Sequence, residues 1–230
     1  MKINKNTYML KHQLLTFIKG IFAGLSIGVG GFLYVIMVHY VDGEGGKVLG
    51  SLLFAVGLFT VCTFYLALYT GKIGLVFEKK QDSKFYVSLP VMLVGNAIGA
   101  ISLGYMCYAI FKNTEVMTTV SNVCASRTSL LTFNDYLSLM IRSSLCGLCV
   151  YLAVKSFNKD RLKPFGIILL VLFVFVFVYA GFQHCIANMF YFGFGNHFIA
   201  ETYINLVLCI LFNSIGTIPG VMLIKVIEKK

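Results

Sequence analysis

The chain has 230 residues, of which 58% are hydrophobic and only 12% are charged, and its mean hydropathy is +0.85. This composition is too apolar for a soluble domain of that length, so the sequence predicts an integral membrane protein. A formal net charge of +10 would favour a nucleic-acid partner in a soluble protein. Here the basic residues gather between apolar segments, which excludes nucleic acid and indicates contact with anionic lipid.

Six apolar segments are long enough to cross a bilayer as helices, which takes roughly 20 residues each. In chain order they cover residues 14–41, 49–77, 85–111, 136–157, 165–192 and 204–227. We therefore predict an all-α membrane protein with six transmembrane helices in a single transport domain over residues 1–230.

The basic residues divide unequally between the two ends of these segments. Only four of the 19 fall on one side, and the positive-inside rule then places both termini in the cytoplasm of a plasma-membrane (cell inner membrane) protein. The four outer residues are Lys47, Lys112, Arg127 and Arg142. The inner residues are Lys2, Lys5, Lys11, Lys19, Lys72, Lys79, Lys80, Lys84, Lys155, Lys159, Arg161, Lys163, Lys225, Lys229 and Lys230.

Along the chain, the first segment carries small residues at helical spacing between Phe22 and Gly31, which predicts a face where a neighbouring backbone packs closely. The second segment is interrupted near its inner end by Thr70-Gly71, followed by Lys72. Broken helices are tolerated at membrane depth where the freed backbone groups line a cavity or are covered by protein. The connection 112–135, rich in Thr, Ser and Asn, predicts a surface loop that includes Cys124, with at most a short re-entrant turn.

Short matches between the two halves indicate an internal repeat. Asn96 and Asn213 both begin an N-x-I-G sequence, in the third and sixth segments. Because each half holds three helices, the second half must enter the membrane inverted, with repeats over about 14–112 and 135–227. The second and fifth segments then correspond, and the fifth also has a polar interruption, at 181–188.

His184 is the one histidine deep inside an apolar segment. An ionisable group there is costly and is a functional hypothesis by default. Its reference pKa of about 6.5 makes proton sharing inexpensive near neutral pH, and the repeat predicts that it faces Thr70. The sequence allows a ring that donates a proton, a neutral ring that hydrogen-bonds a neutral acid, or a histidine that only caps a neighbouring helix.

At this point the sequence shows a family resemblance. Residues 181–189, G-F-Q-H-C-I-A-N-M, resemble the G-F-E-H-S-x-A-N-M signature of the formate/nitrite transporter family. Residues 68–71 are similar to its L-F-T-G loop and residues 95–100 to its G-N-x-x-G-A sequence, and the resemblance spans essentially the whole chain. It implies an aquaporin-like protomer with broken second and fifth helices, assembled as a homopentamer, that passes weak-acid anions such as formate, nitrite, hydrosulfide, acetate or lactate.

The resemblance also implies roles for individual residues. The pore residues are His184, Thr70 and Asn213. The outer constriction is formed by Phe54, Leu58 and Phe177, and the inner one by Leu68 and Tyr69. Support for the helix breaks is expected from Gly71, Gly181, Asn188 and Asn96.

The sequence departs from the family pattern at four positions. Gln183 stands where the family usually has Glu, Tyr69 where it has Phe, and Gly147 where some members have a pore asparagine. The lysine that many members place at the outer vestibule aligns near Leu131, which cannot attract anions. Arg127 and Arg142 are the candidate replacements, and Lys72, on the inner side, is a further candidate anion attractor.

Our hypothesis is a channel that passes an anion together with a proton. Desolvating a small anion costs tens of kcal/mol by an idealised estimate, whereas a neutral acid crosses an apolar constriction more easily. A water or neutral-solute channel is the alternative, although the paired N-P-A motifs of aquaporins are absent; a non-transporting membrane scaffold is another. No nucleotide-binding loop, nucleophile constellation or metal-ligand cluster occurs in the sequence, so neither an enzyme nor a cofactor is predicted.

Overall fold

The computed structural model describes residues 5–159 and 164–228, and within these ranges all regular structure is helical. The basic residues Lys2, Arg161, Lys163, Lys229 and Lys230, used above to predict orientation, lie outside the described residues. The helices are α1 (Lys5–Tyr40), α2 (Glu44–Thr63), α3 (Tyr69–Lys72), α4 (Leu75–Glu78), α5 (Ser83–Phe111), α6 (Val116–Thr128), α7 (Phe133–Phe157), α8 (Phe165–Tyr179), α9 (Cys185–Phe194), α10 (Ala200–Ile215) and α11 (Thr217–Glu228).

Five helical stretches in the described part of the chain are long and apolar enough to cross a membrane. They are α1 from Tyr8, α2, α5, α7, and α10 continued by α11. The remaining predicted segment, 165–192, is divided between α8 and α9, which are apolar but shorter. The second predicted segment, 49–77, contains α2, an irregular stretch and α3. The chain is therefore a multi-pass, all-helical membrane protein.

The prediction of a surface loop over 112–135 is wrong, because most of that connection is α6. Its buried residues recur every fourth position, at Val116, Val120, Cys124 and Thr128, as in a helix with one packed face. This face lies against α9, where the Cys124 thiol donates to the carbonyl oxygen of Tyr191 at 3.2 Å. The Thr and Ser residues between these positions concealed the buried stripe in the sequence.

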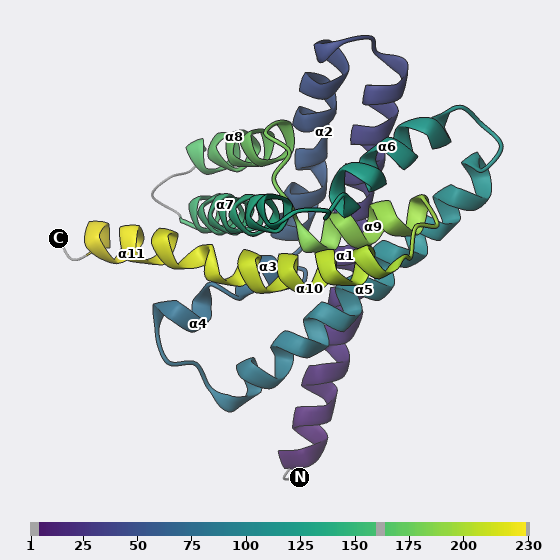
Figure 1. The fold of residues 1–230 in the computed structure, drawn as a ribbon. Coiled ribbons are helices and arrows are strands. Elements are labelled where there is room, and N and C mark those ends of the chain that lie inside the picture. Colours follow the sequence, from purple (N-terminus) through teal and green to yellow (C-terminus); the bar gives the residue numbers. More distant parts are fainter. Residues whose placement is uncertain (1–4, 160–163, 229–230) are drawn as a thin grey trace.

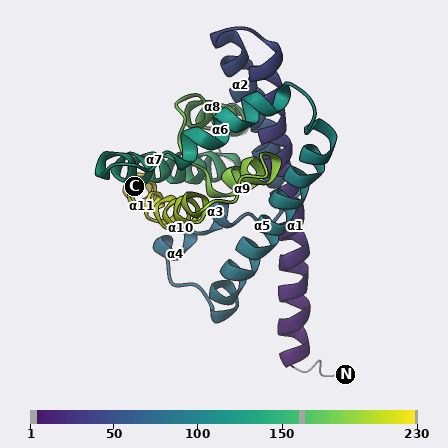
Figure 2. The same ribbon diagram turned by 45° about the vertical axis from the view of Figure 1, so that its right-hand side comes forward.

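Figure 1 shows α1 and α2 running across the direction of α7, α8, α10 and α11. Figure 2 shows the same crossing from a second side. The two groups interlock through their short helices, because α3 contacts α7 and α9 contacts α1 and α5. All ten residues of α9 are buried. The last residues of the irregular segments that precede these short helices, Ala67-Leu68 before α3 and Gln183-His184 before α9, are buried.

Glycines set how closely the long helices approach one another. A Cβ on Gly24 of α1 would collide with the carbonyl oxygen of Asn96 in α5, and a Cβ on Gly147 of α7 would collide with the carbonyl oxygen of Asn213 in α10. The small-residue packing face predicted for the first segment is thus confirmed. Both contacts bring an asparagine-bearing helix against its neighbour at backbone distance, as is common between membrane helices.

Candidate functional site

His184 occupies the N-cap of α9, at the end of the turn that follows α8. Gly181 makes this turn with φ +68°, a left-handed conformation that glycine adopts without steric cost. His184 Nδ1 accepts a hydrogen bond from the Ala187 backbone N–H at 3.2 Å. A ring nitrogen that accepts carries no proton, so the imidazole is neutral in this arrangement and holds its proton on Nε2.

The other ring nitrogen of His184 faces Thr70. The Nε2 and Oγ1 atoms are 2.9 Å apart, although the two residues lie 114 positions apart in the sequence. Both side chains are buried, at 2% and 1% exposure. Because Nε2 carries the proton, it donates to Oγ1, and the threonine hydroxyl remains able to donate its own proton to a third group.

Asn213 fixes the backbone on both sides of His184. Its Oδ1 accepts from the Cys185 N–H at 3.0 Å, and its Nδ2 donates to the carbonyl oxygens of Gln183 and Ser143 at 2.8 Å each. The side chain is 1% exposed, and the partner in each of these three hydrogen bonds is a backbone group. The residue therefore links the start of α9 to α7.

Asn96 makes the corresponding contacts at the other short helix. Its Oδ1 accepts from the Tyr69 N–H, and its Nδ2 donates to the carbonyl oxygens of Ala67 and Gly20, all at 2.8 Å. Each asparagine thus binds the first N–H of a short helix, the carbonyl two residues earlier, and one carbonyl of a long helix. Buried backbone groups outside regular helix are satisfied in this way.

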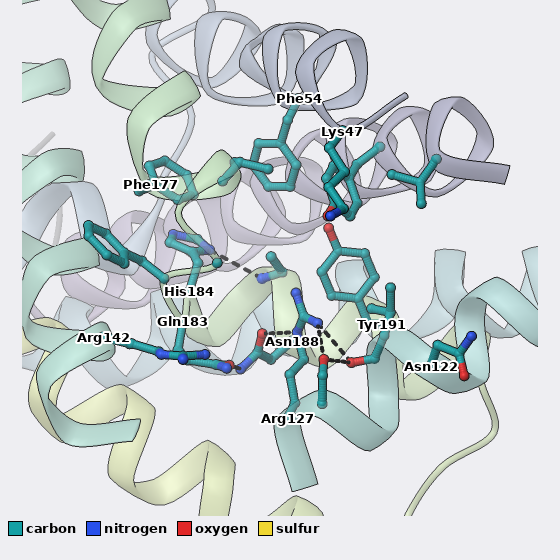
Figure 3. Close-up of a pocket in the computed structure, with 18 of the residues that line it drawn as sticks. Lys47, Phe54, Asn122, Arg127, Arg142, Phe177, Gln183, His184, Asn188 and Tyr191 are labelled. Atoms are coloured by element: carbon teal, nitrogen blue, oxygen red, sulfur yellow. Dashed lines mark hydrogen bonds between the residues drawn. The ribbon is translucent and has the colours of Figure 1, made fainter. Parts of the chain in front are cut away.

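A cavity of about 330 Å³ extends from His184 to the surface. Phe54 and Phe177 line it close to the histidine (Figure 3). The Phe177 ring stacks on the imidazole with centroids 5.9 Å apart, and Phe54 meets Phe177 edge-on at 5.7 Å. Two aromatic rings of the outer cavity therefore lie beside the buried His184.

The upper part of the outer cavity is cationic. Lys47 from α2, Arg127 from α6 and Arg142 from α7 line it, and none of its described lining residues is acidic. Arg127 Nε donates to Asn188 Oδ1 at 3.0 Å, and Lys47 pairs with the exposed Glu44 at 2.7 Å. No hydrogen bond or ion pair within the described ranges involves the Arg142 guanidinium. Such a concentration of one sign of charge attracts anions.

A second, much smaller cavity lies beside α3, the helix that carries Thr70. It measures about 30 Å³, and Leu68, Gly71 and Lys72 are among its lining residues. No residue lines both this cavity and the outer one. Leu58 and Leu68, each 1% exposed, are packed in the core, and Leu58 lines neither cavity.

Some predicted site residues lie elsewhere. The Tyr69 hydroxyl hydrogen-bonds Ser214 Oγ at 3.0 Å, and Tyr69 lines neither cavity. Leu131, at the position of the vestibule lysine, is 87% exposed and also lines neither. Lys47 and Tyr191 also line the outer cavity, although neither had a predicted role there. The Tyr191 ring lies 4.5 Å from the Arg127 guanidinium. Lys47 could have been predicted from its place among the four basic residues on the outer side.

Comparisons with known proteins agree on one family. The family model described as "Formate/nitrite transporter" matches residues 4–227. A solved structure described as "Pentameric formate channel with formate bound" is 24% identical, with a TM-score of 0.78, covering 96% of this chain and 99% of that chain. An "FNT family ion channel" is 19% identical, with a TM-score of 0.73, covering 91% and 86% respectively. These structural likenesses concern the fold. No match is found among curated proteins.

Proposed function

Because the chain belongs to the formate/nitrite transporter family, and is a membrane channel or transporter rather than an enzyme, we propose that it passes small monovalent anions of weak acids together with a proton. Formate, nitrite and hydrosulfide are the proposed substrates. The observation that carries the proposal is the buried His184–Thr70 pair, of which His184 lines a cationic cavity.

The energetic argument favours a neutral permeant. Moving a carboxylate-sized ion into a medium of low dielectric constant costs on the order of 20 kcal/mol in the ideal case, and still several kcal/mol after relaxation. Protonating a carboxylate of reference pKa about 4 at pH 7 spans roughly three pKa units, or about 4 kcal/mol. Apolar constrictions therefore pass the neutral acid more readily than its anion. The anion must be protonated before it reaches the narrowest point.

The described residues suit such a sequence of events. Lys47, Arg127 and Arg142 raise the local concentration of the anion. Phe54 and Phe177 then strip water from it. Beyond the outer cavity, the Thr70 hydroxyl, held by His184, donates a hydrogen bond to the arriving oxygen.

His184 orients the threonine rather than supplying the proton. Direct donation needs an imidazolium, whose Nδ1–H would point at the Ala187 N–H that Nδ1 now accepts, so two donors would oppose each other. A neutral ring has no second proton that it gives up at physiological pH. The proton therefore comes from solvent that reaches the open outer cavity.

The same family membership supports proposals about architecture. We propose six membrane crossings in two inverted repeats, about 14–112 and 135–227, with α2–α3 and α8–α9 as the broken second and fifth helices. The matched contacts of Asn96 and Asn213 support the repeat. The pentameric formate channel supports a homopentamer, and the distribution of basic residues supports cytoplasmic termini in a plasma membrane.

Uptake by proteoliposomes tests the proposal. Labelled formate is added outside vesicles that contain the purified protein, at external pH values from 5 to 7.5. The initial rate is expected to rise by up to about tenfold per unit of acidification, following the protonated fraction. Water flux without formate uptake would identify a neutral-solute channel, and the absence of both would identify a non-transporting scaffold; either result overturns the proposal. Formate uptake that is independent of pH would refute the proposal that a proton passes with the anion.

A further inference from the structure

Gln183 lies directly before His184 and lines two neighbouring cavities. One is the outer cavity, and the other is a polar cavity of about 180 Å³ that shares Arg127 and Arg142 with it. The residue is only 6% exposed. Its carbonyl oxygen accepts from Asn213 Nδ2 at 2.8 Å and from the Cys209 thiol at 3.1 Å. Its backbone position is therefore fixed by α10.

The side-chain amide of Gln183 is also held in one orientation. Asn188 Nδ2 donates to Gln183 Oε1 at 2.7 Å, while Asn188 Oδ1 accepts from Arg127 Nε at 3.0 Å. Because Oε1 faces Asn188, the Nε2 group is the free end of the amide. No hydrogen bond connects Nε2 to any residue that the structure describes. The Nε2 group of this nearly buried side chain therefore faces the cavities with both of its donors available to a ligand.

The charges around this amide are almost all positive. Figure 3 shows Gln183, Arg142 and Arg127 along one wall of the outer cavity, with Lys47 on the opposite wall. Asp135 is the acidic residue of the smaller cavity, but its Oδ2 accepts from the backbone N–H groups of Leu131 and Thr132 and from the Thr132 hydroxyl.

Among the residues that the structure describes, neither Arg127 nor Arg142 forms a salt bridge. A carboxylate in place of the Gln183 amide, as in the family signature, would have the same shape. It would remove the free donor and cancel one positive charge. The neutral amide at this position consequently leaves the positive charge of both arginines unneutralised, although Arg127 already donates from Nε to Asn188 Oδ1 and from Nη1 to the Val123 carbonyl oxygen.

We propose that Gln183 Nε2, Arg142 and Arg127 form a binding site for small monovalent anions in the outer cavity, and that the neutral amide sets its affinity. The inference rests on the proposed function, because bound anions proceed from this site towards His184. A carboxylate or nitrite oxygen accepts from Nε2 while the guanidinium of Arg142 supplies charge. Amide donors combined with arginine are suited to such planar anions.

Two substitutions separate the donor from the charge. Gln183→Met has similar length and no charge, but loses the Nε2 donor together with the Oε1 atom that accepts from Asn188 Nδ2. Gln183→Glu keeps an acceptor for Asn188, loses the Nε2 donor and adds a negative charge. Formate uptake is measured at pH 7.5 in low and high salt, since screening between roughly 10 mM and 1 M shortens the Debye length from about 30 Å to about 3 Å. Gln81→Glu makes the same chemical change between α4 and α5, where Gln81 Nε2 donates to the Leu75 and Lys79 carbonyls.

The order of the half-saturating formate concentrations in these variants distinguishes anion binding by Gln183 from a purely structural role. The half-saturating formate concentration should rise about threefold in Gln183→Met with its salt dependence retained. It should rise about tenfold or more in Gln183→Glu with its salt dependence largely lost. Gln81→Glu should match the wild type. Equal losses in both Gln183 variants, or wild-type behaviour of Gln183→Glu, overturn the inference. Formate uptake by the wild type keeps the proposed function intact in either case.

Discussion

Replacing His184 by asparagine separates its structural contact from its contact with Thr70. An asparagine at the N-cap still offers a side-chain oxygen to the Ala187 N–H, since Asn is among the best N-cap residues. It is too short to reach Thr70 as the imidazole does. His184→Phe, by contrast, keeps a ring but removes both hydrogen bonds.

The structure gives different magnitudes for the two effects. Loss of the cap in His184→Phe should cost about 0.5–2 kcal/mol of stability, whereas His184→Asn should stay within about 0.5 kcal/mol of the wild type. Without the Nε2 donor that orients it, the Thr70 hydroxyl loses its own hydrogen bond to the arriving anion, which should cost about 1.5–3 kcal/mol, as for hydrogen bonds to charged groups. Transport should therefore fall about 10- to 150-fold in both variants.

The assay pairs formate uptake with thermal unfolding of the purified oligomer. We expect His184→Asn to have the same melting temperature as the wild type, and yet to transport formate as poorly as His184→Phe. A His184→Asn protein that retains uptake within about threefold of the wild type would show that the imidazole acts only as a cap. His184 would then have a structural role at the start of α9 and no role in transport.

Three further substitutions have defined outcomes. Thr70→Val removes the hydroxyl that accepts from His184 Nε2 and should lower formate uptake about tenfold; because the buried imidazole donor is then left without an acceptor, stability should also fall by about 1–3 kcal/mol. Arg142→Gln should raise the half-saturating formate concentration several-fold in low salt, and high salt should abolish the difference from the wild type. Gly216→Ala should destabilise the protein by about 1–3 kcal/mol, because its Cβ meets the Ser144 carbonyl oxygen, whereas Gly45→Ala, which meets only a Val41 methyl at 3.6 Å, should not.

The membrane helices were predictable because a bilayer demands apolar runs of a minimum length. The meeting of His184 with Thr70 also followed from sequence, since the signature and the repeat both placed these residues at corresponding interruptions. Helix α6 was missed for a physical reason. It buries only every fourth residue, and the polar residues between them gave the segment the composition of a loop.

The contacts of the asparagines required the structure. The spacing of Asn96 and Asn213 indicated a repeat, but not that each amide binds three backbone groups. Likewise, Lys47 was recognisable as an outer cation, while its place in the same cavity as Arg127 and Arg142 depends on how α2, α6 and α7 meet. Such convergence of distant segments leaves no local pattern in a single sequence.

The threonine and the histidine come from opposite halves of the chain, 114 positions apart. During synthesis the first half enters the bilayer before His184 has been translated, so a partly made protein holds only one member of the pair. The second member arrives on α9, which is itself seated between helices made earlier. The buried pair is therefore complete only when residues from both halves of the polypeptide have been made and packed together.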